Sequence, residues 1–117
     1  MPFADDVGLP TLSRLAGNVA LVDVFAGPQR FRFNYLSEPM IQRLQSNFSG
    51  KFADELELHA PLDFFLSQSS ATVEAKMPTY YARKSSGRGA HRKPGYSRLL
   101  LPTWGDGRVQ LLIGVVA

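Results

Sequence analysis

Hydrophobic positions near the start of the chain change from a continuous run to a strict alternation. Residues 19–25 (VALVDVF) are β-branched or apolar at nearly every position, which predicts a strand buried on both faces. After a short turn, apolar and polar residues alternate over 30–35, placing Phe31, Phe33 and Tyr35 on one face. The two runs therefore predict an antiparallel hairpin with three aromatic rings facing a common core.

A helical spacing of apolar residues follows this hairpin. Ser37 is a favourable N-cap residue and Pro39 suits a first helical turn. Met40 and Phe48 then lie among apolar positions near helical spacing, so we expect a helix here. A second short helical turn is expected over residues 52–56.

The longest helix is predicted over residues 61–77, between two prolines. Pro61 can open a helix, and Pro78 ends it because the residue before a proline is pushed away from helical dihedral angles. Four residues at helical spacing form the apolar stripe that we expect to face the core: Leu62, Leu66, Val73 and Met77.

Three further strands are predicted, over residues 79–82, 96–103 and 108–116. Residues 104–107 join the last two as a tight turn, because an Asp-Gly pair between apolar runs is a strong hairpin signal. Two strands, short helices and three strands are best buried as an α+β fold, a five-stranded antiparallel sheet with its helices on one face. We divide the chain into an N-terminal segment, 1–17, and one domain, 18–117.

Composition narrows the class of protein. A chain of 117 residues that is 44% hydrophobic and 20% charged has room for one globular domain. It contains no cysteine, which excludes disulfides, thiolate catalysis and cysteine-based zinc sites and fits a reducing cytosol. No run approaches the roughly 20 apolar residues that span a bilayer, and no secretory signal pattern opens the chain. We therefore expect a cytoplasmic protein that does not engage a membrane.

Motifs of catalysis are missing from the sequence. His59 and His91 each lack a second histidine at metal-ligand spacing, and no nucleophile elbow, phosphate-binding loop or dinucleotide fingerprint occurs. The carboxylates Asp54, Glu55 and Glu57 are typical of a solvated face. These observations favour a protein that binds something over an enzyme.

Aromatic residues suggest where a ligand could bind. Buried tyrosine hydroxyls need partners, and several tyrosines lie on predicted strands facing a helical layer that contains small residues. A cavity with a few polar groups would form there, although plain core packing is the alternative for most of the rings. The candidates for lining such a pocket are Tyr35, Met40, Phe48, Phe65, Tyr80 and Tyr96.

Basic residues gather in one segment of the chain. Residues 83–93 contain five Lys or Arg and no acid, a pattern that could meet phosphate. The surrounding Gly, Ser and Pro residues instead favour a solvated, mobile loop. No aromatic residue lies inside the run to stack on single-stranded bases. We favour the loop, and nucleic acid is the partner that the sequence supports least.

Three segments together resemble one bacterial branch of the PAS fold, the small PAS-like proteins of alphaproteobacteria. Residues 21–24 leading into 30–33 are similar to that branch's hairpin, and residues 48–56 (FSGKFADEL) are similar to its "L-T-G-[RK]-x-x-D-E-L" stretch. Residues 96–102 (YSRLLLP), with 105–107 and 112–114, resemble its C-terminal "Y-E-R-L-L-L-P" hairpin. The chain departs from this pattern at Ser37 and Gln45, where the branch has glycine, and at Ser97, where it has glutamate.

The resemblance implies a sensory or regulatory module in bacterial signalling, without catalysis, that binds a small ligand or a signalling protein. It leaves the cofactor unknown. Light-sensing relatives use a cysteine beside a flavin, which this chain lacks, and haem-binding relatives use a histidine on the long helix, which His59 only precedes. The alternatives are a homodimerisation or scaffold domain with a filled core and, less supported, a nucleic-acid binder.

The last two predicted strands are apolar on both faces. Leu99 and Leu101 point opposite to Leu100, and the same alternation holds along 108–116. Because the helices cover one face of the sheet, we expect a second copy of the chain to cover the other face, in a homodimer interface of about 800 Å² per partner. The alternative is that residues 9–15 fold back over this face within one chain.

Overall fold

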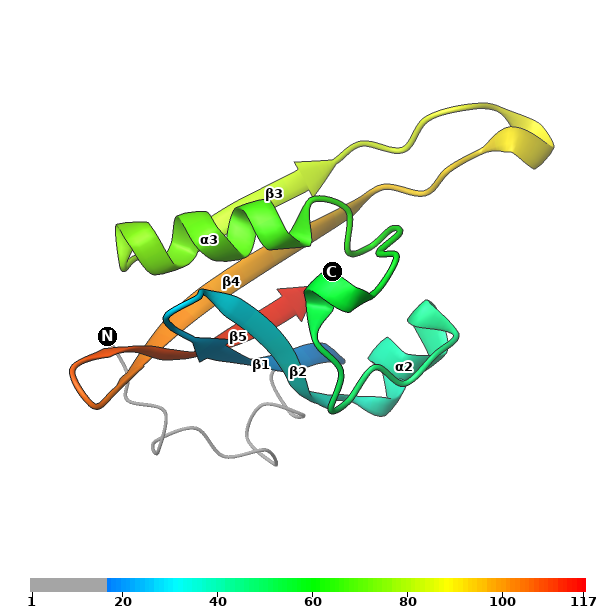
Figure 1. The fold of residues 1–117 in the computed structure, drawn as a ribbon. Helices are drawn as coiled ribbons and strands as arrows, with labels where there is room; N and C mark the ends of the chain where they lie inside the picture. The colour runs from blue at the N-terminus through cyan, green and yellow to red at the C-terminus, as the bar shows by residue number, and fades with distance from the viewer. Residues whose placement is uncertain (1–16) are drawn as a thin grey trace.

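Five antiparallel strands form one sheet in the computed structural model, which describes residues 17–117. Within these residues there are also two α-helices, α2 (Glu38–Leu44) and α3 (Phe65–Ala75), and two short 3-10 turns, η2 (Ala53–Glu55) and η3 (Gly89–His91). Helix α3 lies across one face of the sheet (Figure 1). The predicted α+β architecture is confirmed. In spatial order, the strands are β2 (Arg30–Leu36), β1 (Asn18–Phe25), β5 (Arg108–Val116), β4 (Tyr96–Gly105) and β3 (Thr79–Arg83).

A bulge in β2 changes the predicted alternation of the first hairpin. Leu21 pairs with Tyr35 but Val22 pairs with Phe33, so Asn34 is an extra residue. Beyond the bulge, Tyr35 shares a face with Leu21, away from the core, while Leu36 is buried in it. The prediction that Tyr35 faces the core with Phe31 and Phe33 is therefore wrong. A period of two cannot show where one residue is inserted.

Ser37 begins α2 as predicted but uses its hydroxyl elsewhere. The helix has no side-chain cap, and its N-cap backbone is extended. The Ser37 hydroxyl instead accepts a hydrogen bond from the Val19 N–H at 2.9 Å and donates one to the Gly17 carbonyl at 2.7 Å. Ser37 thereby ties the start of α2 to the start of β1. The helix ends at Leu44, so Phe48 lies beyond it rather than within it.

Helix α3 is the longest helix, as predicted, but it begins later and presents a different face. Residues 61–64 form a turn, with the Phe65 N–H bonded to the Leu62 carbonyl, and Phe64 adopts a left-handed conformation (φ 58°). The helix then buries Phe65, Gln68, Ser69 and Thr72. Of the predicted stripe, Leu62 precedes the helix, Leu66 and Met77 are exposed, and Val73 is half-buried.

The hairpin between β4 and β5 has a shorter turn than predicted. Trp104 and Gly105 belong to β4, which leaves Asp106 and Gly107 as the turn. Both turn residues have positive φ angles (52° and 78°), as a type I′ turn requires. An Asp-Gly pair meets this requirement at little cost because Asp tolerates the left-handed region and glycine has no Cβ.

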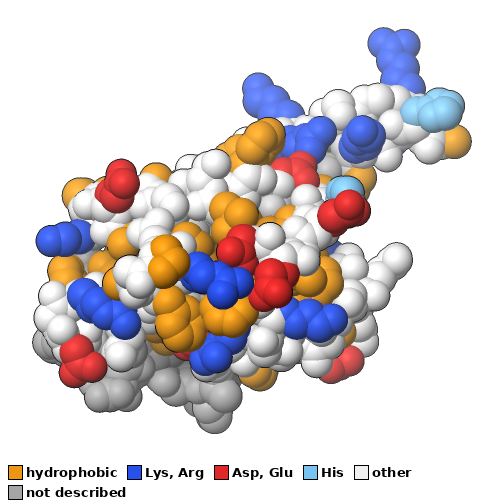
Figure 2. Space-filling model, viewed as in Figure 1, with side chains coloured by type: hydrophobic (Ala, Val, Ile, Leu, Met, Phe, Trp, Pro, Cys, Tyr) orange, Lys and Arg blue, Asp and Glu red, His pale blue; other side chains and the backbone are white. Residues whose placement is uncertain are grey.

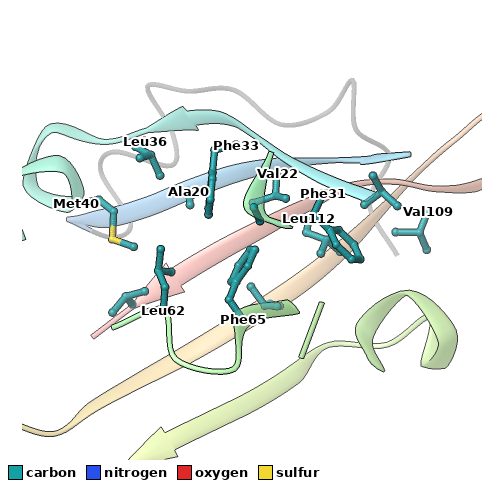
Figure 3. Packing of buried hydrophobic residues seen from close by; sticks show 14 of the residues in the cluster. Ala20, Val22, Phe31, Phe33, Leu36, Met40, Leu62, Phe65, Val109 and Leu112 are labelled. Atoms are coloured by element: carbon teal, nitrogen blue, oxygen red, sulfur yellow. The ribbon is translucent and has the colours of Figure 1, made fainter. Parts of the chain in front are cut away.

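The hydrophobic core fills the space between the sheet and α3. Phe33 of β2 and Phe65 of α3 stack with their ring centroids 5.3 Å apart, and Figure 3 shows them facing each other. Leu36, Met40 and Leu62 close one end of this core, and Phe31 and Val109 lie at the other.

The opposite face of the sheet also carries aliphatic side chains. Val19, Leu21 and Ile113 alternate with core residues along β1 and β5 and are buried, while Leu101 and Leu111 are half-buried. This face therefore has the apolar character that the strand patterns predict. The segment 9–15, which is the alternative to a second copy for covering this face, lies outside the described residues.

The two neighbouring residues Phe65 and Leu66 test which face of α3 meets the sheet. Phe65→Ala should lower the free energy of unfolding by about 3–5 kcal/mol, because it removes a buried ring that stacks on Phe33. Leu66→Ala should cost less than about 1 kcal/mol, because Leu66 is 37% exposed. Urea unfolding of both variants measures the two losses of unfolding free energy. A larger loss for Leu66→Ala would show that Leu66, as the sequence predicts, faces the core.

Candidate functional site

An arginine occupies the interior where the sequence suggests a ligand cavity. Arg98 projects from β4 toward α3 and is only 1% exposed. Its guanidinium donates to Gln68 Oε1 at 2.6 Å, to the Pro61 carbonyl at 2.9 Å and to the Asp63 carbonyl at 2.7 Å. Arg98 thus joins β4 to α3 and to the turn that precedes α3.

Gln68 extends this network to the edge strand. Its side-chain amide donates to the Thr79 backbone carbonyl, to the Thr79 hydroxyl and to the Arg98 carbonyl, at 3.1–3.3 Å. The Thr72 hydroxyl, one helical turn further along α3, donates to the Gln68 carbonyl at 2.8 Å and lies 2.5 Å from the Thr79 hydroxyl. The polar stripe of α3 therefore binds β3 and β4 by hydrogen bonds rather than by apolar contact.

The charge of Arg98 is balanced by dipoles and aromatic rings. No carboxylate among the described residues forms an ion pair with it, and the guanidinium carbon lies 5.1 Å from the Tyr81 ring centroid and 5.6 Å from that of Phe65. Burial lowers the pKa of Arg98, although an arginine stays protonated in a protein. Moving this buried cation would break its hydrogen bonds and cost free energy, so the side chains around Arg98 are held in one arrangement.

The structure separates the six residues proposed to line an internal ligand pocket. Met40, Phe65 and Tyr96 belong to the core cluster, and Phe48 is partly buried against it. Tyr35 lies on the opposite face of the sheet, and Tyr80 is 68% exposed. Four of the six residues are therefore core or near-core side chains, and the other two face away from the proposed pocket.

Tyr96 is the one candidate with a buried hydroxyl that has no hydrogen-bond partner among the described residues. This hydroxyl is buried and unpaired among the described residues, as is the Ser69 hydroxyl on α3. Burial raises the pKa of Tyr96 to about 12, and the nearby negative charge of Asp63 contributes to the rise. Tyr96 is consequently neutral at physiological pH.

A hollow of about 240 Å³ lies at the opposite end of β4, between the last turn of α3 and two hairpin turns. We call it the Trp104 pocket. It lies at the end of the core marked by Val109 (Figure 3). Its walls are apolar in part, and no Asp or Glu of residues 17–117 lines it. The lining residues that matter for its chemistry are Val24, Val73, Lys76, Trp104, Arg108 and Val109.

Two cations give the Trp104 pocket its electrostatic character. The Lys76 ammonium lies 5.6 Å from the Trp104 ring centroid. Arg108 Nη1 donates to the Val24 carbonyl at 2.9 Å and to the Val109 carbonyl at 3.2 Å, so backbone dipoles orient its guanidinium. Neither cation has a carboxylate partner within the described part of the chain. The pocket can therefore accept a negative charge beside an apolar group.

The acidic cluster is a solvated face, as the sequence indicates. Asp54 and Glu55 are exposed and pair with Arg30 at 3.0 and 3.2 Å, and Arg30 lies 3.8 Å from the Phe52 ring centroid. The hydrogen bond from Arg30 lowers the pKa of Asp54. These contacts fasten η2 to β2.

Within residues 17–117, no group of three or more His, Cys, Asp or Glu could hold a metal ion. In the same residues, no helix is long and apolar enough to cross a membrane.

Sequence reasoning missed both Arg98 and the Trp104 pocket. The alternation Tyr96, Arg98, Leu100 along β4 places an arginine between two core positions, and this signal was available. The pocket had no comparable signal. Lys76 and Arg108 are 32 residues apart in the chain and meet only because the end of α3 lies over the β4–β5 turn.

Comparison with known proteins agrees with the geometry of the sheet. No protein-family model and no curated protein matches the chain. A solved structure of a fungal LOV domain photoreceptor is similar, with a TM-score of 0.55 and 16% sequence identity over 86% of this chain and 72% of that chain. The chain therefore has the PAS-like α+β fold that LOV domains share.

Proposed function

We propose that this chain is a non-catalytic sensory or regulatory module of bacterial signalling in the cytoplasm, and that its input is a small organic anion bound in the Trp104 pocket. The observation that carries the proposal is the pairing of apolar walls with two cations that have no carboxylate partner in the described residues. The PAS-like fold and the three segments that resemble alphaproteobacterial PAS proteins support the signalling role.

Position makes the pocket a suitable input site. It contacts the C-terminal end of α3, the β1–β2 turn and the β4–β5 turn, which are far apart in the sequence. A ligand that contacts all three would change how firmly the end of α3 is held on the sheet. The buried network of Gln68 and Arg98 anchors the other end of α3, so the ligand would act on the end farther from that network.

The dimensions of the pocket define the class of ligand. A volume of about 240 Å³ lies below the ~300–1,000 Å³ of sites for drug-sized molecules, so the ligand is small. Val24, Val73 and Val109 suit an apolar or aromatic group, and Lys76 and Arg108 suit a carboxylate beside it. Small aromatic or branched carboxylic acids combine both features.

Trp104 provides the readout because it is the single tryptophan of the chain. Titration with phenylacetate should change the Trp104 fluorescence saturably, and uncharged phenylacetamide should bind at least fivefold more weakly. Lys76→Gln should weaken phenylacetate binding by roughly fivefold, as expected for the loss of about 1 kcal/mol from one exposed charge contact.

The matched control is Lys51→Gln, which removes an exposed lysine outside the pocket and should leave binding unchanged. Equal affinity for phenylacetate and phenylacetamide would show that the cations do not recognise the ligand. An equal effect of both lysine variants would show that binding occurs elsewhere, and either result would refute the proposal for this site.

Homodimerisation is the second candidate function, and the outer face of the sheet favours it. This face carries aliphatic side chains from β1, β4 and β5, and Leu101 pairs with Ile113 near its middle. A second copy of the chain is the occupant that we propose, because an isologous contact would cover the face on both copies at once. The outer-face residues that are only half-buried, and so keep area that a second copy could cover, are Leu99, Leu101, Leu111 and Val115.

Sedimentation velocity at micromolar concentration tests this interface. The chain should sediment as a dimer, and Leu101→Arg should shift it to the monomer because a charge would be buried at the contact. Gln42→Arg, which adds the same charge to an exposed position on α2, should remain dimeric. A wild-type monomer at 100 µM, or equal behaviour of the two variants, would contradict the dimer.

A further inference from the structure

The basic segment between β3 and β4 is an ordered arm rather than an irregular loop. Residues 84–95, which we call the arm, run out beyond the sheet and return to it (Figure 1). Ser86 and Lys93 form an antiparallel bridge, with N–H to carbonyl distances of 2.9 and 2.6 Å. The 3-10 turn η3 closes the tip, where the His91 N–H donates to the Arg88 carbonyl at 3.1 Å. The segment is solvated, as expected, but its outgoing and returning backbone segments are paired with each other.

Two glycines allow the outgoing and returning segments of the arm to approach each other closely. A Cβ on Gly95 would lie 2.5 Å from the Arg83 carbonyl oxygen, and a Cβ on Gly87 would lie 2.2 Å from the His91 carbonyl oxygen. Gly87 also has a positive φ of 83°, which a side chain would disfavour. The arm is therefore a thin two-stranded ribbon whose narrowness depends on glycine at these positions.

Positive charge is concentrated on the arm and at its base. Residues 83–95 contain five of the 13 Lys and Arg residues and none of the ten acids, so the rest of the chain carries eight bases against ten acids. Arg83, at the base, pairs with Asp63. The other four cations, Lys84, Arg88, Arg92 and Lys93, are exposed and form no ion pair within the described residues. Lys and Arg side chains project from the arm into solvent (Figure 2).

We propose that the arm binds double-stranded DNA without sequence specificity by placing its cations against phosphates. A two-stranded ribbon fits the major groove of B-DNA, which is about 12 Å wide, whereas the major groove of duplex RNA is too narrow. The small residues Ser85, Ser86 and Ala90 keep the ribbon thin. The absence of aromatic side chains from the arm argues against single strands, because these are bound by stacking.

A membrane surface is the less suitable polyanion. The arm contains only Ala90 and Pro94 as apolar residues, so it has no large side chain to insert among lipids. Its charges also lie on both chains of the ribbon, with Lys84 on the outgoing chain and Arg92 and Lys93 on the returning one. Charges on two sides of a ribbon suit a groove with phosphates on both walls better than a flat surface.

Fluorescence anisotropy with a labelled 24-base-pair DNA duplex tests the proposal on the full chain. Each phosphate neutralised contributes about −0.9 to the slope of log K against log salt, so four cations predict a slope near −3.6. Affinity should then fall by about a hundredfold between 50 and 200 mM KCl. Arg92→Ala with Lys93→Ala should halve this slope, so that the fall becomes about tenfold.

The control is Arg43→Ala with Lys51→Ala, which removes two exposed cations outside the arm and should leave the slope unchanged. Both double variants should retain the stability of the wild type within about 0.5 kcal/mol, as substitutions at exposed sites do. The absence of DNA binding at 50 mM KCl would overturn the proposal. So would equal losses in the two double variants, stronger binding to single strands, or binding to phosphatidylserine vesicles that DNA does not compete with. The Trp104 pocket shares no residue with the arm, so failure here leaves the proposed ligand site untouched.

Discussion

The position of α3 on the sheet depends on one buried guanidinium. Arg98 has no carboxylate partner in the described chain, so the cost of removing its charge from water is offset by hydrogen bonds to Gln68 and to two backbone carbonyls. These acceptors lie on α3 and on the turn before it, whereas Arg98 lies on β4. The guanidinium can be satisfied only when all three segments are in place. Asp63 reinforces the arrangement, because its carbonyl accepts from Arg98 and its carboxylate pairs with Arg83 of β3.

This constraint directs function to the edges of the domain. The interior between α3 and the sheet is occupied by Arg98, Phe65 and Phe33, which are almost fully buried. The features available for recognition are a pocket where α3 ends, an apolar outer sheet face and a cationic arm beyond β3 and β4. The pocket and the arm lie at opposite ends of β4, so β4 connects them through the residue that fixes α3.

Local chemistry explains which features could be predicted from the sequence. Runs of apolar and β-branched residues mark the strands, and Asp106-Gly107 matches its turn type, so the β1–β2 and β4–β5 hairpins were correctly predicted. The bulge at Asn34 and the left-handed Phe64 were not predictable, because each follows from tertiary contacts. The apolar pattern predicts the wrong face of α3, because the buried stripe of this helix is largely polar. In fact Gln68 and Thr72 are buried there by hydrogen bonds.

The predicted internal pocket was wrong for Tyr35 and Tyr80, which do not face the core. The Trp104 pocket is lined by residues that are far apart in the sequence and are brought together by the fold.

The most direct test of this account is the hydrogen exchange of the Arg98 Nε–H group, measured by NMR on protein labelled with ¹⁵N-arginine. The resonance is assigned by its disappearance in Arg98→Lys. Because the Nε–H donates to Gln68 Oε1 at 2.6 Å in a buried site, it should exchange far more slowly than the other arginine Nε–H groups, and Gln68→Ala should abolish that protection. Exchange of Arg98 as fast as that of the exposed Arg88 would contradict the claim that this guanidinium fixes α3 on the sheet.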